Sequence, residues 1–167
     1  MVVKDRSDIS DHIYSLLREV HDPEIPVLSI MDMGVVRNVA FTDNIWIITI
    51  TPTYSGCPAM DVMAVDIKQK LEQSGYQCQV NLSLSPAWNT DWITDSGRQA
   101  LQDYGIVPPM DAAADKSALL GGERVVPCPR CNSTETKMIS QFGSTACKAL
   151  FQCTSCLEPF DYFKCLK

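Results

Sequence analysis

Several features of catalytic and nucleic-acid-binding proteins are absent from this sequence. It has only two histidines in 167 residues. It has no histidine-based nucleophile pair and no glycine loop of the kind that binds phosphate. Its 14 Lys and Arg stand against 20 Asp and Glu, with no basic stripe that could neutralise a nucleic-acid backbone. These absences argue against an enzyme in its own right and against binding to DNA or RNA.

Long apolar runs and a secretion signal are also missing. No segment approaches the ~18 apolar residues that a membrane span requires, and the opening residues MVVKDRSD carry charges without an apolar core. Eight cysteines in a chain without an export signal indicate reduced thiols that bind metal. We therefore expect a cytoplasmic protein that is not attached to a membrane.

Four of the cysteines form two Cys-x-x-Cys pairs near the C-terminus, Cys128 with Cys131 and Cys153 with Cys156. The two-residue gap lets both sulfurs of a pair reach one ion, and four thiolates complete a tetrahedral zinc site without an open position. Residues 132–152 between the pairs slightly exceed the usual ~15–20-residue spacing, which a hairpin can accommodate. The pattern predicts structural zinc, while a single iron or a cluster fits the same ligands. Two disulfides are the alternative.

The hydrophobic pattern before these pairs alternates between helix and strand periodicity. Apolar residues three or four positions apart predict helices, and strict alternation predicts strands. The fold class that we expect is α+β, with a compact domain of order α-β-β-α-β-α followed by a small four-cysteine zinc-ribbon hairpin. The predicted helices lie near 8–20, 58–74 and 94–104, and the predicted strands near 33–41, 45–53 and 76–84. The predicted domain spans residues 1–107, a linker of small residues spans 108–122, and the ribbon spans 123–167.

Cys57 is the most suggestive residue outside the ribbon. It precedes Pro58, a residue type favoured at the first position of a helix, so we expect Cys57 to cap the second predicted helix. Unpaired backbone N–H groups and the helix dipole at such a position lower the pKa of a thiol. The residue could bind a metal or an iron–sulfur species, or it could be a buried cysteine in a tight turn.

Two acidic residues flank Pro23 just after the first predicted helix. Asp22 and Glu24 are held on a rigid, extended segment and could bind a cation or transfer protons. The alternative is a pair of solvated acids at a helix exit. His12 and His21 match no ligand spacing, and we interpret both as structural or surface residues.

Cys147 and Cys165 are the additional cysteines of the C-terminal segment. Cys147 shares a predicted strand face with Ala149, Phe151 and Cys153, so we expect its thiol to point into the small core of the ribbon. We interpret both as packed thiols, with a six-thiol site as the alternative.

Particular segments resemble two related protein families. Residues 22–30 (DPEIPVLSI), 32–36 (DMGVV) and 53–58 (TYSGCP) resemble the SufT-like, MIP-type domain of iron–sulfur protein maturation factors. A second set of segments resembles the D-subunit family, PaaD or PaaJ, of the bacterial phenylacetyl-CoA epoxidase system, over about residues 10–107 and 124–167. These segments are residues 51–59, 86–92, 104–106, 142–150 and 158–165.

This resemblance implies an accessory role in aerobic phenylacetate degradation, beside a di-iron epoxidase and its flavin/iron–sulfur reductase. It implies cluster assembly or repair, with Cys57 as the cluster-handling thiol and Asp22 and Glu24 as signature acids. The four thiols of the two pairs, Cys128, Cys131, Cys153 and Cys156, would be zinc ligands. The implied partners are the reductase or oxygenase subunits.

A single thiol cannot hold a cluster, so this role requires a shared site. The second ligand would come from Cys57 of a homodimer partner or from a client protein. A structural or regulatory epoxidase subunit that handles no cluster is the competing hypothesis.

Overall fold

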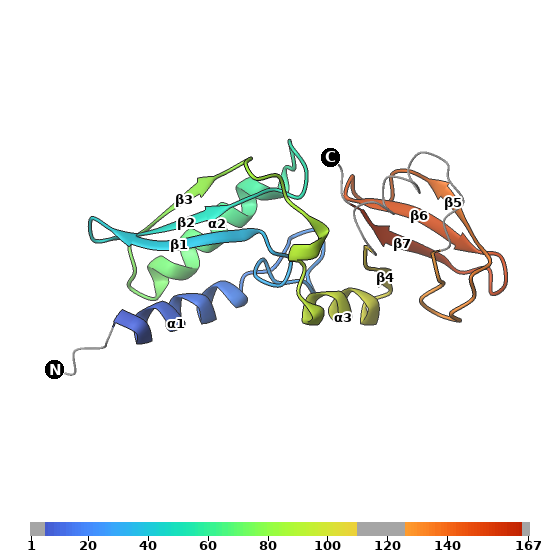
Figure 1. Ribbon diagram of the computed structural model, residues 1–167, viewed down its shortest axis with the longest axis horizontal. Coiled ribbons are helices and arrows are strands. Elements are labelled where there is room, and N and C mark those ends of the chain that lie inside the picture. The colour runs from blue at the N-terminus through green and yellow to red at the C-terminus, as the bar shows by residue number, and fades with distance from the viewer. Residues whose placement is uncertain (1–5, 110–125, 165–167) are drawn as a thin grey trace.

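A computed structural model describes residues 6–109 and 126–164 as two sheets with three α-helices (Figure 1). The N-terminal part, residues 6–105, contains a three-stranded sheet of order β1-β2-β3. The ribbon module, residues 126–164, supplies most of a four-stranded sheet of order β4-β7-β6-β5. The predicted α+β class is confirmed. Most of the predicted linker, from residue 110 onward, lies outside the described residues, as does Cys165.

The N-terminal sheet begins with a hairpin whose turn chemistry can be followed in the sequence. Strands β1 (Val36–Thr42) and β2 (Ile45–Ile50) are antiparallel, with Thr42 opposite Ile45. The two turn residues, Asp43 and Asn44, have φ of 50° and 66°, as a type I′ turn requires. This is the short connection that the sequence predicted.

Both strands of this hairpin are shorter than predicted. Gly34 leaves the strand conformation with a φ of 72°. A Cβ atom at this position would lie 2.5 Å from the Trp92 carbonyl oxygen, so a close backbone contact ends the strand pattern here. Pro52 follows β2 and carries no N–H with which to extend the ladder.

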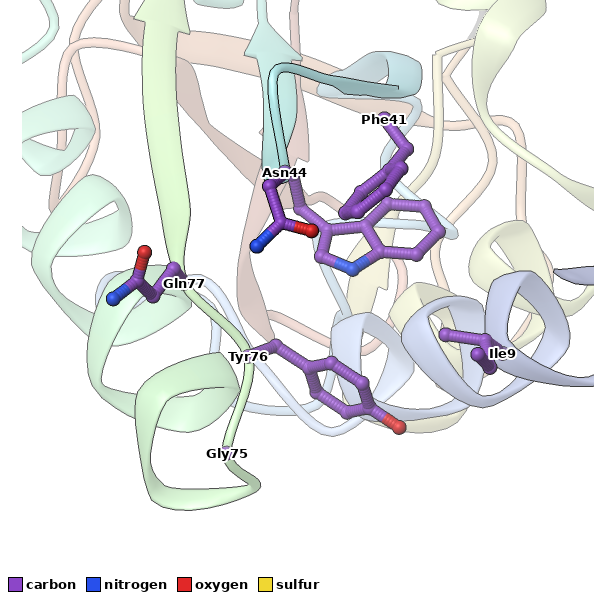
Figure 2. Close-up of a pocket in the computed structure, with 7 residues that line it drawn as sticks. Ile9, Phe41, Asn44, Gly75, Tyr76 and Gln77 are labelled. Atoms are coloured by element: carbon purple, nitrogen blue, oxygen red, sulfur yellow. The ribbon is translucent and has the colours of Figure 1, made fainter. Parts of the chain in front are cut away.

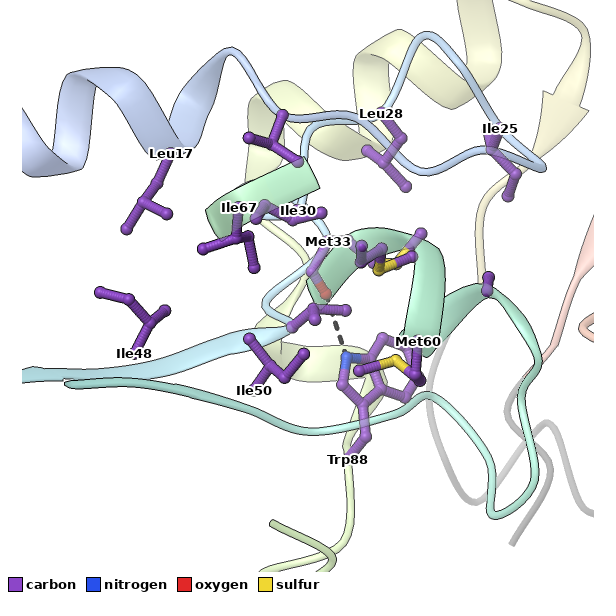
Figure 3. Packing of buried hydrophobic residues seen from close by; sticks show 14 of the residues in the cluster. Leu17, Ile25, Leu28, Ile30, Met33, Ile48, Ile50, Met60, Ile67 and Trp88 are labelled. Carbon is purple, nitrogen blue, oxygen red and sulfur yellow. Dashed lines mark hydrogen bonds between the residues drawn. The ribbon is translucent and has the colours of Figure 1, made fainter. Parts of the chain in front are cut away.

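Two helices cover one face of this sheet. Helix α1 (Arg6–Arg18) contacts α2 (Ala59–Gln73), and α2 leads into β3 (Cys78–Leu82), which pairs with β2 in parallel. Figure 3 shows Leu17, Ile67 and Ile48 meeting between the helices and the sheet. These three residues are fully buried, so the amphipathic faces predicted from spacing form the core.

The connection after β3 holds the two parts of the molecule together. A short 3-10 helix η1 (Thr90–Trp92) precedes α3 (Asp95–Asp103), which is capped by the Thr94 hydroxyl. The next strand, β4 (Ile106–Val107), pairs in parallel with β7 (Pro159–Phe163). The N-terminal part is therefore continuous with the sheet of the ribbon module through β4.

The remaining strands of the ribbon module form an antiparallel meander. Strand β5 (Thr136–Ser140) pairs with β6 (Lys148–Cys153), and β6 pairs with β7. One end of this sheet packs against the N-terminal part, where the rings of Phe163 and Trp88 lie edge to face with centroids 6.0 Å apart. Figure 3 shows the Trp88 indole N–H donating to the Met33 carbonyl, at 3.0 Å. The two parts thus share buried aromatic contacts.

Candidate functional site: a four-thiol centre and a thiol–carboxylate cluster

The four thiols of the two Cys-x-x-Cys pairs come together at one end of the ribbon module. Their sulfur atoms all lie within 4.8 Å of one another, with 3.7 Å between Cys128 and Cys156 and 3.6 Å between Cys131 and Cys153. Zinc–sulfur bonds of ~2.3 Å in a tetrahedron place sulfurs about 3.8 Å apart. The thiols are free, so the disulfide alternative is wrong. Their arrangement fits a bound zinc ion.

Backbone N–H groups stabilise the thiolate form of a cysteine in this centre, which is the form that binds a metal ion. The Cys156 N–H donates to Cys153 Sγ at 3.4 Å, and this contact, with a second from the Ser155 N–H, lowers the pKa of Cys153 to about 6. At Cys156 the Glu158 N–H also lowers the pKa, but burial and three neighbouring thiols raise it to about 12. The Cys153 thiol therefore loses its proton more readily than the Cys156 thiol, and a bound metal ion would favour the thiolate form of its ligands.

Cys57 lies two residues before α2, next to Pro58, the N-terminal capping residue of the helix. Pro58 already has helical φ and ψ of −69° and −21°, and the Met60 N–H donates to the Cys57 carbonyl at 3.3 Å. The thiol accepts hydrogen bonds from the Ala59 N–H and from the Tyr54 hydroxyl. The capping residue of α2 is Pro58, so the predicted capping position of Cys57 is wrong by one residue.

The expected lowering of the pKa at this position is wrong. Burial is the largest influence and raises the pKa of Cys57, and the carboxylates of Glu24 and Asp22 raise it further. The hydrogen bonds from Ala59 and Tyr54 act in the opposite direction without overcoming these effects. The thiol is half-buried and protonated at neutral pH.

The two signature acids differ in what they contact. The buried carboxylate of Asp22 accepts hydrogen bonds from the backbone N–H groups of Glu24, at 2.6 Å, and of Ile25, at 2.8 Å. Asp22 therefore stabilises the turn around Pro23. Burial nevertheless raises the pKa of Asp22, against the effect of these two hydrogen bonds.

Glu24 points toward the ribbon module instead. Cys147 Sγ donates to Glu24 Oε2 at 3.6 Å, and Lys148 Nζ donates to the Glu24 carbonyl at 3.4 Å. These contacts join residues that are 123 and 124 positions apart in the chain. The turn that Asp22 stabilises thus positions a carboxylate at the junction of the two parts.

The location predicted for Cys147 is wrong. Ala149, Phe151 and Cys153 line the core of the ribbon module, but Cys147 packs into the core of the N-terminal part. The cause is its place in the chain, because β6 begins only at Lys148 and Cys147 belongs to the turn that faces the N-terminal part. The thiol is buried, as expected of a packed thiol, and burial raises its pKa to about 11. Among the described residues it does not join the four-thiol centre.

We refer to Asp22, Glu24, Tyr54, Cys57 and Cys147 as the junction cluster. Burial, then the neighbouring Cys57 thiol, and then the charges of Glu24 and Cys147 raise the pKa of Tyr54 to about 12. A groove of about 560 Å³ is lined in part by Glu24 and Lys148. Sequence reasoning identified Asp22, Glu24 and Cys57 but did not associate Cys147 or Tyr54 with them. No periodic signal in the sequence connects residues so far apart.

A second cavity lies at the opposite end of α2 and carries little chemistry. Figure 2 shows Phe41, Tyr76 and Ile9 around a pocket of about 410 Å³, with the amides of Asn44 and Gln77 at its edge. Its described lining contains no thiol, carboxylate or histidine. We therefore do not assign it to the functional site.

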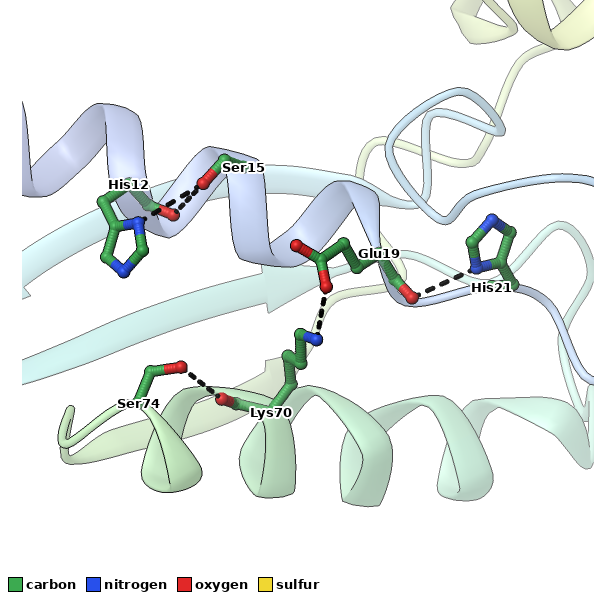
Figure 4. A network of polar contacts seen from close by, with 6 residues as sticks. All are labelled: His12, Ser15, Glu19, His21, Lys70 and Ser74. Carbon is green, nitrogen blue, oxygen red and sulfur yellow. Dashed lines mark hydrogen bonds and ion pairs between the residues drawn. The ribbon is translucent and has the colours of Figure 1, made fainter.

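The histidines contribute to neither group of thiols. Figure 4 shows His12 beside Ser15 and His21 hydrogen-bonded through Nδ1 to the Glu19 carbonyl, at 3.1 Å. Both rings belong to exposed residues, in agreement with their interpretation as structural or surface residues. Nearby, the Glu19–Lys70 ion pair joins the end of α1 to α2.

Two protein families match separate parts of this chain. Residues 10–82 match a family described as iron-sulfur cluster assembly protein, and residues 112–164 match the PaaD zinc beta ribbon domain. A protein of Escherichia coli, described as the putative D subunit of 1,2-phenylacetyl-CoA epoxidase, is 52% identical over 155 residues, which are 92% of each chain.

Two further relatives match the N-terminal part. An Fe-S protein maturation auxiliary factor of Porphyromonas gingivalis is 35% identical over 100 residues, covering 58% of this chain and 91% of that protein. The crystal structure of the domain of unknown function DUF59 from Bacillus anthracis aligns with a TM-score of 0.53 at 27% identity. It covers 57% of this chain and 92% of that one. Within the described part of the chain, no helix has the length and apolar character needed to cross a membrane.

Proposed function

Since this chain belongs to the PaaD family of phenylacetyl-CoA epoxidase D subunits, we propose that it is a cytoplasmic accessory factor that assembles or repairs iron–sulfur clusters for that epoxidase system. The client is its iron–sulfur reductase component. The observation that carries the proposal is Cys57. It is a half-buried thiol at the start of a helix, within the segment that matches iron-sulfur cluster assembly proteins.

The four-thiol centre has a different role in this proposal. Four cysteines with no open ligand position hold a structural zinc ion and leave no place for a substrate. The ribbon module also exposes large apolar side chains, with Phe142 59% and Leu157 68% accessible. Each of these side chains would lose contact with water if another protein covered it. The ribbon, predicted to span residues 123–167, would dock the client while the N-terminal domain, residues 1–107, handles iron and sulfide.

Anaerobic reconstitution with ferrous iron and sulfide tests the role of Cys57. We expect the zinc-loaded wild type to take up both, and Cys57→Ser to lose most of this uptake. Cys78→Ser is the matched control, because Cys78 is also a half-buried thiol with a pKa raised by burial, but it lies on β3. Equal uptake by wild type and Cys57→Ser would exclude Cys57 as the site.

The exposed apolar residues of the ribbon module also favour the competing function, a structural or regulatory subunit. The two proposals differ in the partner and in the consequence of removing this protein. Stable stoichiometric binding to the oxygenase, with a fully loaded reductase made in its absence, would support the structural role. An iron-depleted reductase made without this protein, restored by its co-expression, would support maturation.

A further inference from the structure

We propose that the groove beside Glu24 docks the reductase component by accepting an arginine or lysine side chain from it. The inference rests on the proposed function, because it takes the reductase as the client. It goes beyond that function by naming the surface that docks the client and the chemistry of the segment that this surface accepts. The bound segment would carry one basic side chain flanked by apolar residues.

The groove, of about 560 Å³, is formed where the end of α3 meets the ribbon module. Residues 104–106 supply one wall, and Figure 1 shows β4, which begins in this segment, beside the ribbon strands. The other wall comes from the turn between β5 and β6 and from the start of β7, through residues 142–144 and 159–161. Both parts of the molecule are therefore needed to form the groove.

Two exposed aromatic rings line the groove from opposite parts of the chain. Tyr104, which caps the C-terminus of α3, is 55% exposed, and Phe142, from the turn between β5 and β6, is 59% exposed. Aromatic rings attract the cations of arginine and lysine through their faces. Phe142 already has such a contact within the chain, because the Lys164 ammonium lies 4.3 Å from its ring centroid. Rings of this kind favour a basic side chain with an apolar stem.

The acidic groups of the groove are more accessible than the basic groups near it. Glu24 and Asp161, which line the groove, are half-buried, whereas Lys148 is only 5% exposed and Lys164 only 1%. The Lys148 ammonium donates to the Glu24 carbonyl oxygen, and the Lys164 ammonium donates to the Gln141 carbonyl oxygen. The charge that the groove presents to an incoming side chain is therefore negative, which is complementary to a basic residue.

The Asp161 carboxylate is held in position for this contact. Its Oδ2 accepts a hydrogen bond from the Ser144 hydroxyl at 3.0 Å. A Cβ atom on Gly143 would lie 2.6 Å from Asp161 Oδ1, so the glycine leaves room for the carboxylate in the wall of the groove. A carboxylate has more acceptor sites than one hydroxyl occupies and can also accept hydrogen bonds from a guanidinium or an ammonium group.

Calorimetric titration of the purified reductase component into the full-length, zinc-loaded protein tests the groove. The groove variants are Tyr104→Ala, Phe142→Ala and Asp161→Asn. Leu157→Ala is the matched control for Phe142→Ala, because Leu157 is a 68% exposed apolar residue of the ribbon module outside the described lining. Ser144→Ala is the control for Asp161→Asn, because it removes their hydrogen bond and keeps the charge. Zinc content and the thermal unfolding midpoint show whether each variant folds.

We expect Tyr104→Ala and Phe142→Ala each to weaken binding at least about tenfold, as aromatic residues at the centre of an interface do. Tyr104 lies outside the ribbon module, so its variant tests the groove even if Phe142→Ala does not fold. Asp161→Asn should weaken binding and its dependence on salt, because salt screens the lost attraction. Leu157→Ala and Ser144→Ala should bind as the wild type does.

The basic residue on the reductase is tested by a double-mutant cycle. Hydrogen exchange of the reductase in the complex locates the bound segment, and its basic residue is then replaced by glutamine. We expect this replacement to weaken binding to the wild type and to cause much less further loss in Asp161→Asn, since the two changes remove one interaction. Fully additive losses would overturn the contact with Asp161.

Wild-type affinity in all three groove variants would overturn this inference and leave the proposed function intact. Tighter binding by Asp161→Asn would also overturn it, because the groove would then accept an acidic segment at Lys148. Binding of the oxygenase component in place of the reductase would overturn the occupant named here. The proposed function fails separately, if the reductase carries its full iron content when it is made without this protein.

Discussion

Asp22 and Glu24 lie on either side of one proline, but their carboxylates form different contacts. The Asp22 carboxylate accepts two hydrogen bonds from backbone N–H groups of its own turn. The Glu24 carboxylate instead contacts the Cys147 thiol of the ribbon module. The spacing of the two acids suggests a pair with one function. Their hydrogen bonds show that Asp22 stabilises its own turn, whereas Glu24 connects that turn to the ribbon module.

At this scale we predict that Asp22→Ala destabilises the protein by about 1–3 kcal/mol, because it leaves two backbone N–H groups without their acceptor. The Ile25 side chain in this turn is fully buried, so water replaces the lost acceptor poorly. Asp22→Asn keeps an acceptor oxygen and should be much less destabilised. Denaturant unfolding of the three proteins at neutral pH measures the difference. Equal stability of Asp22→Ala and Asp22→Asn would exclude this role.

The pH dependence of Asp22 provides a second check. Burial raises its pKa in the folded protein above the ordinary value of 3.8, so the folded state binds a proton more tightly than the unfolded state. Stability therefore decreases as pH rises from about 3.8 through the raised value, and the loss is complete above it. Relative to Asp22→Asn, the wild type should be more stable in acid than at neutral pH. A difference that does not change with pH would contradict the effect of burial.

The strands of the ribbon module enclose a smaller hydrophobic core than the N-terminal part. Its buried apolar side chains form a separate small cluster, which includes Val126, Phe151, Phe160 and Tyr162. A module of this size rarely buries enough apolar surface to be stable without a metal or a disulfide. The four free thiols at the ends of its hairpins indicate that the metal supplies this stability.

We therefore predict that removing the metal with a chelator unfolds the ribbon module and leaves the N-terminal sheet folded. Structural zinc contributes about 10–16 kcal/mol in isolated zinc-finger peptides, more than such a core can replace. Hydrogen exchange should accelerate in β5, β6 and β7 and remain slow in β2, the central strand of the other sheet. Readdition of zinc should restore protection. Unchanged exchange in the metal-free protein would show that packing alone holds the ribbon.

At the scale of the whole molecule, a few buried side chains connect the two parts. Phe163, from the last strand, is fully buried against Trp88, and Cys147 lies in the same core cluster. Strand β4 adds a backbone connection between the end of α3 and the ribbon sheet. The junction cluster lies at this same boundary, so its geometry depends on how the two parts pack.

We predict that Phe163→Ala destabilises the protein by about 3–5 kcal/mol, because it empties a buried aromatic site. It should also separate the unfolding of the N-terminal part from that of the ribbon module. Calorimetry detects this as two transitions in place of one. Phe142→Ala is the matched control, since Phe142 is 59% exposed, and its effect should be small. A single transition with wild-type stability in Phe163→Ala would exclude the role of this contact.

The local features of this protein follow from its sequence. Two Cys-x-x-Cys pairs, a proline after Cys57 and helical spacing of apolar residues depend on neighbours only a few positions away. The four thiols therefore form the centre that their spacing predicts, and Cys57 reaches the start of α2. The start of β1 was predicted less well, because the close contact between Gly34 and Trp92 has no counterpart in strand periodicity.

Only the tertiary structure decided what surrounds these residues. It placed Cys147 beside Glu24, 123 positions away, because the packing of two sheets brings a turn of the ribbon module against the turn after α1. It also reversed the pKa expected of Cys57, because burial and two nearby carboxylates outweigh the hydrogen bonds at the helix start. Periodicity and motif spacing describe interactions along the chain. Desolvation and contacts between distant segments arise only when the chain is packed.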